Sequence, residues 1–320
     1  MEKKFGWCFI GAGRIARTVF GDSEGINVVS VYSRTFERAE DFASIAGAKA
    51  YQSLEEAVLA PGVDAVYVAV PHVDHFSCTM AALKLVKPVL CEKPMSIRAE
   101  FAEQMIAAAR EANLFLMEAM WPRFNPVLRT VRQWIASGEI GEVRYMTADF
   151  ADSRPVDFGA EYYQADKAGG ALLDMGVYPL ALAGMVFGSH PEAVHAFGKV
   201  ANGVDTRLTA VLEYGGGRTA SLFSGLDVSG RSEAVIHGEK GLITIPVYWM
   251  AREAVLHRKD GEKMTVTRDG CTGWGYQMRE AERLILAEAK ESPEMSLADT
   301  LSVSRTMDAL LAQLGIAYGG

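Results

Sequence analysis

The chain has 320 residues, which is long for one domain and ordinary for two. Apolar residues make up 49% of it and charged residues 22%, as in most folded proteins. The net charge of −8 argues against general affinity for nucleic acid or for anionic lipid. The chain begins without a signal-peptide core, and its longest weakly polar stretch, Met175 to Phe187, is shorter than the ~20 residues of a membrane span. We therefore expect neither a nucleic-acid nor a membrane partner.

The cysteines carry no metal or disulfide pattern. Cys8, Cys78, Cys91 and Cys271 are scattered, without a CxxC pair or a Cys/His cluster at zinc spacing. We expect reduced thiols in a cytoplasmic protein and no metal site.

A glycine-rich turn follows the first expected strand, Phe5 to Ile10. Its sequence, Gly11-Ala12-Gly13-Arg14-Ile15-Ala16, has the pattern G-x-G-x-x-A. The first glycine permits a tight turn, and the second lets the backbone approach a pyrophosphate. Ala16 is small enough for close packing of the helix on the strand. We predict a nucleotide here, contacted by Gly11, Gly13, Arg14 and Ile15.

The end of the second expected strand indicates which dinucleotide binds. NAD sites place an acid about 20 residues past the glycines to hold the ribose 2′-hydroxyl. This chain instead has Ser33 and Arg34 there, with Arg38 one helical turn later. Two guanidiniums and a hydroxyl suit a 2′-phosphate, so we predict NADP rather than NAD. The alternative is that Arg38 is a surface residue paired with Glu37 or Asp41.

Apolar strands and helices alternate through the first 117 residues, which indicates a doubly wound parallel sheet. The later expected strands are Lys49–Tyr51, Ala65–Val70, Val89–Cys91 and Leu114–Met117. We assign residues 1–121 to this dinucleotide-binding domain. Pro71 and His75 follow a central strand and are expected near its ligand crevice, although a structural or solvent-facing His75 fits the spacing equally well.

Lys93 is the first candidate for catalysis. Pro94 cannot donate to a sheet and moves Lys93 out of the helical region, so the strand must stop there. Glu92 and Lys93 are therefore expected at the carboxyl end of a strand, which in an open α/β sheet faces the crevice. The alternative is an exposed loop lysine.

The pattern changes after Trp121, where alternating segments follow one another without intervening helices. These segments are Glu142–Phe150, Ala193–Val200, Thr206–Tyr214, Thr219–Leu226, Ser232–His237 and Leu242–Ile245. They indicate antiparallel strands, so we assign residues 122–320 to an α+β domain with a large, mostly antiparallel sheet. Its uncovered face is expected to be buried against a partner subunit.

One stretch of this domain contains further candidates. Gly169 and Gly170 precede an apolar helix, and Asp174 is a natural N-cap for it. Asp174 and Tyr178 are four residues apart and would share a helix face. The alternative is that Asp174 only caps the helix and that Tyr178 is packed in the core.

Aromatic residues provide candidates for a substrate pocket. Trp121, Phe150 and the cluster Trp274-Gly275-Tyr276 would form a wall for a ring, with Tyr178 beside it. Aromatics in such places also serve as ordinary core or interface residues.

Taken together, the Gly11–Ala16 motif, Cys91-Glu92-Lys93-Pro94 and the stretch Gly169 to Tyr178 resemble the Gfo/Idh/MocA oxidoreductase family. The resemblance covers essentially the whole chain and implies a Rossmann domain joined to an open-faced sheet. It also implies that Lys93, Asp174 and Tyr178 line the active site, and that dimers or tetramers form through the sheet face. Tyr178, where many members have histidine, is most similar to the dimeric dihydrodiol dehydrogenases and glucose–fructose oxidoreductase.

We therefore expect an NADP-dependent enzyme that oxidises or reduces a sugar, polyol or cyclic trans-diol as a homodimer. Tyr178 is the expected acid/base, and Lys93 would supply the positive charge that favours its phenolate. Asp174 would anchor a substrate hydroxyl or position Lys93. The alternatives are a non-catalytic NADP-binding sensor and a purely structural oligomer that makes no use of the glycine turn.

Overall fold

A computed structural model describes residues 4–188, 190–270 and 273–319. The chain divides into two compact units. The first contains the described residues within 1–96, 100–121 and 271–297, and the second those within 97–99, 122–270 and 298–320. The chain thus crosses between units near the expected boundary at Trp121. It also returns one segment of the expected second domain to the first unit.

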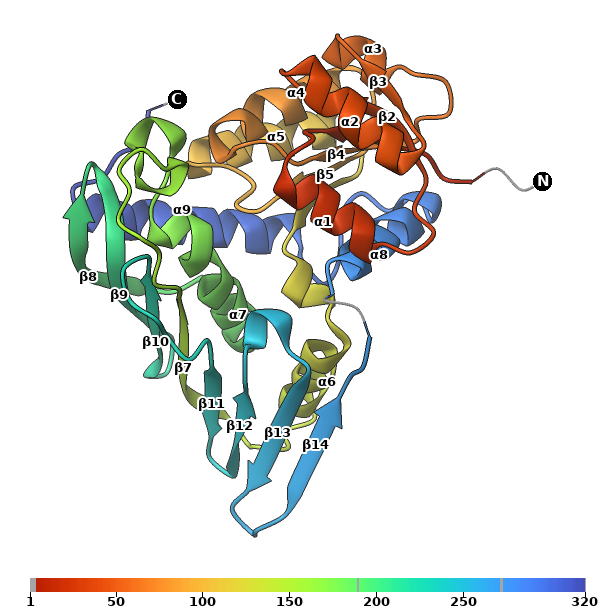
Figure 1. Cartoon of the computed structure of the whole chain (residues 1–320). Coiled ribbons are helices and arrows are strands. Elements are labelled where there is room, and N and C mark those ends of the chain that lie inside the picture. Colours follow the sequence, from red (N-terminus) through yellow and green to blue (C-terminus); the bar gives the residue numbers. More distant parts are fainter. Residues whose placement is uncertain (1–3, 189, 271–272, 320) are drawn as a thin grey trace. The chain divides into compact units, whose positions relative to one another are not determined.

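The first unit is built on a six-stranded parallel sheet in the order β3-β2-β1-β4-β5-β6 (Figure 1). The strands are β1 (Trp7–Ile10), β2 (Val28–Tyr32), β3 (Lys49–Tyr51), β4 (Ala65–Val68), β5 (Val89–Glu92) and β6 (Leu116–Ala119). Every residue of β1, β4, β5 and β6 is buried, as expected for parallel strands covered on both faces. The predicted doubly wound sheet is confirmed.

The helices of this unit are α1 (Arg14–Asp22), α2 (Phe36–Ala46), α3 (Leu54–Val58), α4 (His75–Lys84), α5 (Ala99–Glu111) and α8 (Gly275–Leu286). Helix α8 belongs to the returning segment and lies beside α1 (Figure 1). The Asp22 carboxylate accepts the backbone N–H groups of Gly273 and Gly275, at 3.0 and 2.9 Å. Trp7 donates its indole N–H to Glu282 at 2.7 Å. These long-range bonds hold the segment in the first unit.

The second unit contains an eight-stranded sheet in the order β14-β13-β12-β11-β7-β10-β9-β8, in which only β7 and β10 pair in parallel. The strands are β7 (Val143–Ala151), β8 (Ala193–Ala201), β9 (Val204–Tyr214), β10 (Arg218–Gly225), β11 (Ala234–Gly238), β12 (Gly241–Ile245), β13 (Glu253–Arg258) and β14 (Lys263–Thr267). The predicted mostly antiparallel sheet is confirmed. Strands β13 and β14 were not predicted, because they are short and are bounded by charged residues on both sides.

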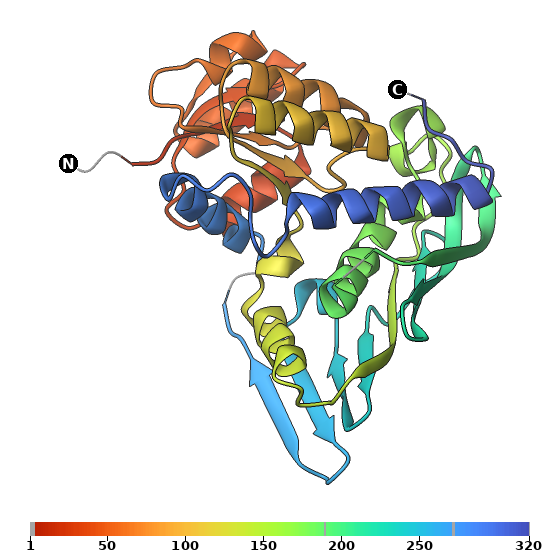
Figure 2. The ribbon, with the colours of Figure 1, turned by 180° about the vertical axis from the view of Figure 1, so that it is seen from behind.

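Helices α6 (Pro126–Ala136) and α7 (Val177–Phe187) pack against one face of this sheet (Figure 2). Helix α9 (Leu297–Gln313) reaches β8, where Gln313 accepts the backbone N–H of Ala196 at 2.8 Å. No helix among the described residues of this unit covers the opposite face of the sheet, and residues of β9 alternate between buried and more exposed positions.

The apolar stretch Met175 to Phe187 forms the end of a longer segment that also contains a separate 3₁₀ turn, Ala165–Lys167. The segment Ala165–Phe187 has 23 residues, and its 18-residue apolar window has a mean hydropathy of 1.6, which by length and composition alone suffices to cross a membrane. However, 83% of its most apolar window is buried inside the structure. One such mostly buried helix is weak evidence for a membrane span, because core helices share these properties.

Candidate active site

The glycine turn of the first unit has the shape that a pyrophosphate requires. Gly11 has a φ of +110°, and a Cβ on it would overlap the carbonyl oxygen of Ala69, so no other residue fits without a shift. A Cβ on Gly13 would meet no described atom within 4 Å. Gly13 is also the N-cap of α1 and offers no side chain to the N–H groups of the first turn. The turn therefore fits a dinucleotide phosphate, with Arg14 exposed and Ile15 half-buried beside it.

The two arginines after β2 are both exposed. Arg34 is 71% exposed and lies 3.1 Å from the Asp74 carboxylate, which follows β4. Asp41, considered as a partner for Arg38, is instead 2.8 Å from Arg17. Ser33 is half-buried between β2 and α2. Both arginines thus follow β2 and are open to solvent, and their contact with a 2′-phosphate stays a prediction.

Lys93 directly follows the end of β5, where the buried Glu92 holds its backbone in place. The buried Glu92 carboxylate accepts hydrogen bonds from the Tyr67 hydroxyl (2.6 Å), the Lys93 backbone N–H (3.2 Å) and Gln277 Nε2 (3.4 Å). Burial raises the pKa of the Glu92 carboxyl, although the Tyr67 hydrogen bond opposes the shift. These three hydrogen bonds engage the Glu92 carboxylate within the first unit. Glu92 would therefore affect a cofactor through the position of Lys93.

His75 also supports this turn. The side chain is buried, with Nδ1 2.8 Å from the Pro94 carbonyl and Nε2 2.9 Å from the Val70 carbonyl. Burial lowers the pKa of the imidazole, although both carbonyl contacts oppose the shift. A neutral ring donates to only one of the two carbonyls at a time. His75 is therefore not solvent-facing and supports the turn at the Lys93–Pro94 bond, which is cis, whereas its predicted place in a cofactor site stays a prediction.

Pro71 and Trp121 are the other two predicted residues of this unit. Pro71 is half-buried and precedes the 3₁₀ turn His72–Asp74. Trp121 is buried, with its ring centroid 5.2 Å from that of Trp274. These two rings of the predicted aromatic wall are therefore in contact, and their role in a substrate pocket stays a prediction.

In the second unit, the helix that carries Asp174 begins earlier than predicted. Helical geometry is already present at Ala171, and Leu172–Gly176 forms a π-helical turn that leads into α7. Asp174 therefore lies inside this turn and is not the N-cap, so that prediction was wrong. The carboxylate of the buried Asp205 on β9 accepts the Leu172 N–H at 2.8 Å and satisfies the helix start.

The Asp174 carboxylate has a partner that sequence reasoning missed. Arg154, on the loop after β7, donates from Nη1 to Asp174 Oδ2 at 2.7 Å. Burial lowers the pKa of the Arg154 guanidinium, but the Asp174 and Asp152 carboxylates raise it by more. No sequence spacing links these two residues, because the intervening loop has no regular pattern.

Tyr178 lies one turn after Asp174 and is surrounded by aromatic rings. Its ring centroid is 5.5 Å from Phe150 and 6.4 Å from Trp249. Phe150 and Trp249 are stacked at 4.5 Å with an angle of 9° between their planes. The predicted neighbourhood of Phe150 and Tyr178 is present, and Trp249 was missed. Trp249 follows strand β12, much as Phe150 stands near the end of β7. This position was the signal in the sequence that could have indicated Trp249 as a member of the aromatic wall.

The predicted residues thus form two groups, one in each unit. Lys93, Glu92 and His75 belong to the first, and Asp174, Tyr178 and Phe150 to the second. Their action on one substrate stays a prediction.

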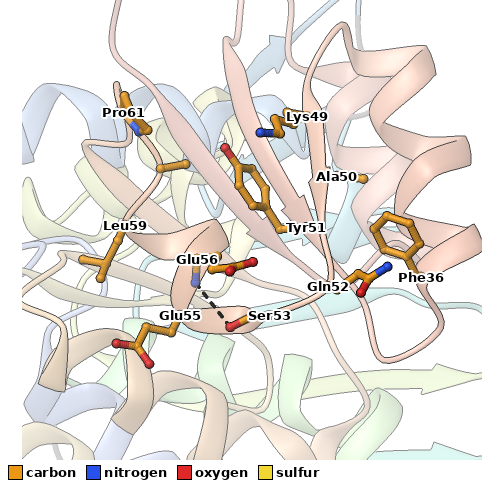
Figure 3. Close-up of a pocket in the computed structure, with 11 residues that line it drawn as sticks. Phe36, Lys49, Ala50, Tyr51, Gln52, Ser53, Glu55, Glu56, Leu59 and Pro61 are labelled. Carbon is orange, nitrogen blue, oxygen red and sulfur yellow. Dashed lines mark hydrogen bonds between the residues drawn. The ribbon is translucent and has the colours of Figure 1, made fainter.

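A separate surface hollow of about 830 Å³ lies beside β3 and α3, with Tyr51, Gln52 and Leu59 in its lining (Figure 3), and contains no predicted site residue. Among the described residues, no cluster of three His, Cys, Asp or Glu side chains is arranged to hold a metal.

The chain is similar to known proteins along most of its length. Residues 5–120 match the model of an oxidoreductase family with an NAD-binding Rossmann fold, and residues 128–244 match the GFO/IDH/MocA C-terminal domain. The trans-1,2-dihydrobenzene-1,2-diol dehydrogenase of Xenopus laevis is 37% identical over 91% of each chain. That of Mus musculus is 32% identical over 98% of this chain and 97% of its own.

Solved structures show the same fold. KijD10, a 3-ketoreductase from Actinomadura kijaniata in complex with NADP and TDP-benzene, has a TM-score of 0.84 with 28% identity over 97% of both chains. The aldose-aldose oxidoreductase of Caulobacter crescentus has a TM-score of 0.85 over 97% of both chains. At 24% identity, it supports the fold alone.

Proposed function

Because the chain belongs to the Gfo/Idh/MocA oxidoreductase family, we propose that it is an NADP-dependent enzyme acting on a secondary alcohol of a sugar, polyol or cyclic trans-diol. The observation that carries the proposal is the position of Tyr178, one helical turn after Asp174 and beside the stacked rings of Phe150 and Trp249. An aromatic wall next to a phenol and a carboxylate suits a substrate that has both an apolar ring face and hydroxyl groups.

Three side chains would carry the proton chemistry. In the oxidative direction, Tyr178 takes the proton of the substrate hydroxyl while the carbon–hydrogen bond breaks and a carbonyl forms. Lys93 favours the phenolate through its positive charge and donates a hydrogen bond to the reacting oxygen. Asp174 accepts a hydrogen bond from a second hydroxyl and so orients the ring. Bound NADP supplies the hydride exchange.

The preference for NADP is supported by Arg34 and Arg38, which follow β2 where an NAD site would have an acid. Gly11, Gly13, Arg14, Ile15, Ser33 and Pro71 would form the rest of the cofactor site, with Glu92 and His75 acting as supports. The KijD10 structure contains NADP, which agrees with this preference.

A spectrophotometric screen of sugars, polyols and trans-diols with NADP and NAD side by side tests the proposal. We expect turnover of at least one such alcohol, faster with NADP. The relatives named as dihydrobenzenediol dehydrogenases make trans-diols the first substrates to try. NADP binding without turnover across the panel would favour the sensor alternative, and absence of nucleotide binding would favour a structural role.

We also propose that the protein is a cytoplasmic homodimer formed through the open face of the second-unit sheet. Val235, Leu242 and Val255 alternate with buried residues and are only half-buried on that face. Cys8, Cys78 and Cys91 are free thiols, as a reducing compartment requires, whereas Cys271 lies outside the described residues. Light scattering should give a dimer mass, and Leu242→Arg should shift it toward the monomer.

A further inference from the structure

Arg154 is held from several directions in the second unit. Its backbone N–H donates to the Leu226 carbonyl at 2.8 Å, just after the end of β10. Its guanidinium carbon lies 4.9 Å from the centroid of the Tyr162 ring, and Nε is 3.5 Å from Asp152 Oδ2. Nη1 is also bonded to Asp174 at 2.7 Å. Both the backbone and the guanidinium group of Arg154 are therefore held in place.

This ion pair differs from the exposed pairs of the same unit. The Arg154 and Asp174 side chains are 24% and 29% exposed, whereas Arg144 and Glu239, near the other end of β7, are each 48% exposed. A short, partly buried, charge-assisted bond is weakened less by solvent and salt than an exposed one. Arg154 therefore holds the Asp174 carboxylate through a strong bond to its Oδ2 atom.

We propose that Arg154 is a positioning residue for substrate binding, which rests on the proposed function. It holds the Asp174 carboxylate in one orientation, so that the carboxylate accepts a hydrogen bond from a substrate hydroxyl next to the Tyr178 phenol. It also balances the charge of Asp174. The site is thereby suited to a neutral polyol, sugar or diol, and Arg154 acts on the substrate through Asp174.

The test compares Arg154→Gln, Arg154→Lys and the matched control Arg144→Gln. We expect Arg154→Gln to raise KM for the best alcohol roughly 10- to 100-fold, the effect of one lost charge-assisted hydrogen bond, with a smaller change in kcat. NADP affinity should stay within about twofold of wild type. Arg154→Lys should recover part of the loss, because it keeps the charge but not the planar fork. Arg144→Gln should behave as wild type, and circular dichroism checks that each variant is folded.

A double-mutant comparison tests whether Arg154 acts through Asp174. In an Asp174→Asn background, Arg154→Gln should raise KM by less than about threefold, because the group that it positions is already altered. Fully additive effects, or a KM within about twofold of wild type in the single variant Arg154→Gln, would overturn the proposal.

Failure of the proposed function would be recognised separately. If the wild-type protein binds NADP but turns over no alcohol, calorimetric binding of trans-cyclohexane-1,2-diol to the NADP-bound protein becomes the readout. An Arg154→Gln dissociation constant raised at least about tenfold would then support the positioning role. Equal constants, or no binding to wild type, would overturn it.

Discussion

The Asp205 carboxylate on β9 accepts the backbone N–H of Leu172 at 2.8 Å and closes the start of the helical segment that carries Asp174 and Tyr178. Its position also constrains the preceding glycine. Gly170 has a φ of +107°, and a Cβ on it would overlap Asp205 Oδ1 and lie 3.0 Å from the Tyr318 hydroxyl. Tyr318 itself donates to the Gly169 carbonyl. The C-terminal segment and a buried acid thus together fix the glycine turn before the candidate catalytic helix.

The buried Asp205 should make stability depend on pH. Burial raises the pKa of its carboxyl to about 7 from an ordinary value of 3.8. The folded pKa lies above the unfolded one, so the protonated Asp205 carboxyl contributes to the free energy of unfolding. This contribution is complete below about pH 4 and is lost as the pH rises through about 7. Asp205→Asn cannot ionise and still accepts the Leu172 N–H. From pH 5 to pH 8, we expect the unfolding free energy of the wild type to fall by about 2–3 kcal/mol more than that of Asp205→Asn.

Urea unfolding at the two pH values measures this difference. Asp41→Asn, at an exposed pair with Arg17, is the control and should leave the pH dependence unchanged. Parallel pH profiles for wild type and Asp205→Asn would show that Asp205 is already ionised in the folded protein at pH 5.

Removal of Trp249 should weaken substrate binding and leave the cofactor unaffected. Trp249→Ala removes the ring stacked on Phe150, a contact worth about 0.5–1.5 kcal/mol beyond the area it buries. We expect KM for a cyclic diol to rise about 3- to 10-fold. Leu286→Ala, at a side chain 71% exposed at the end of α8 in the first unit, serves as the control. An unchanged KM in Trp249→Ala would remove Trp249 from the substrate wall.

The arginines after β2 should determine the cofactor preference. Arg34→Ala and Arg38→Ala should each raise the dissociation constant of NADPH roughly 10-fold or more, because each removes a charged contact with the 2′-phosphate. The constant for NADH should hardly change, since NADH has no such phosphate. Fluorescence titration measures both, with Arg110→Ala, at an exposed position on α5, as the control. Equal losses for both cofactors would indicate a general effect on the fold.

Local sequence patterns predicted the parts of the molecule that depend on neighbouring residues. Pro94 ends β5 where it must, and the glycine turn stands between β1 and α1. Long-range partners were not predictable. Nothing near Asp174 in the sequence indicates that Asp205 takes its expected capping role, or that Arg154 binds its carboxylate.

The same limit explains the domain boundary and the missed strands. The returning segment is held by bonds such as Gln277 to Glu92, between residues 185 positions apart. Strands β14 and β13 are the outermost two at one edge of the sheet. They are short and bounded by charged residues, so their apolar pattern extends over too few residues to reveal a strand in the sequence.

The most direct test of the central claim measures turnover and NADPH affinity together in Tyr178→Phe and Lys93→Met. If the Tyr178 phenol is the acid/base, kcat should fall by roughly 10²- to 10⁴-fold in Tyr178→Phe. If the Lys93 ammonium favours the ionised form of this phenol, kcat should also fall steeply in Lys93→Met. The dissociation constant of NADPH should change only a few-fold in Tyr178→Phe. Near-normal turnover in either variant would contradict the account.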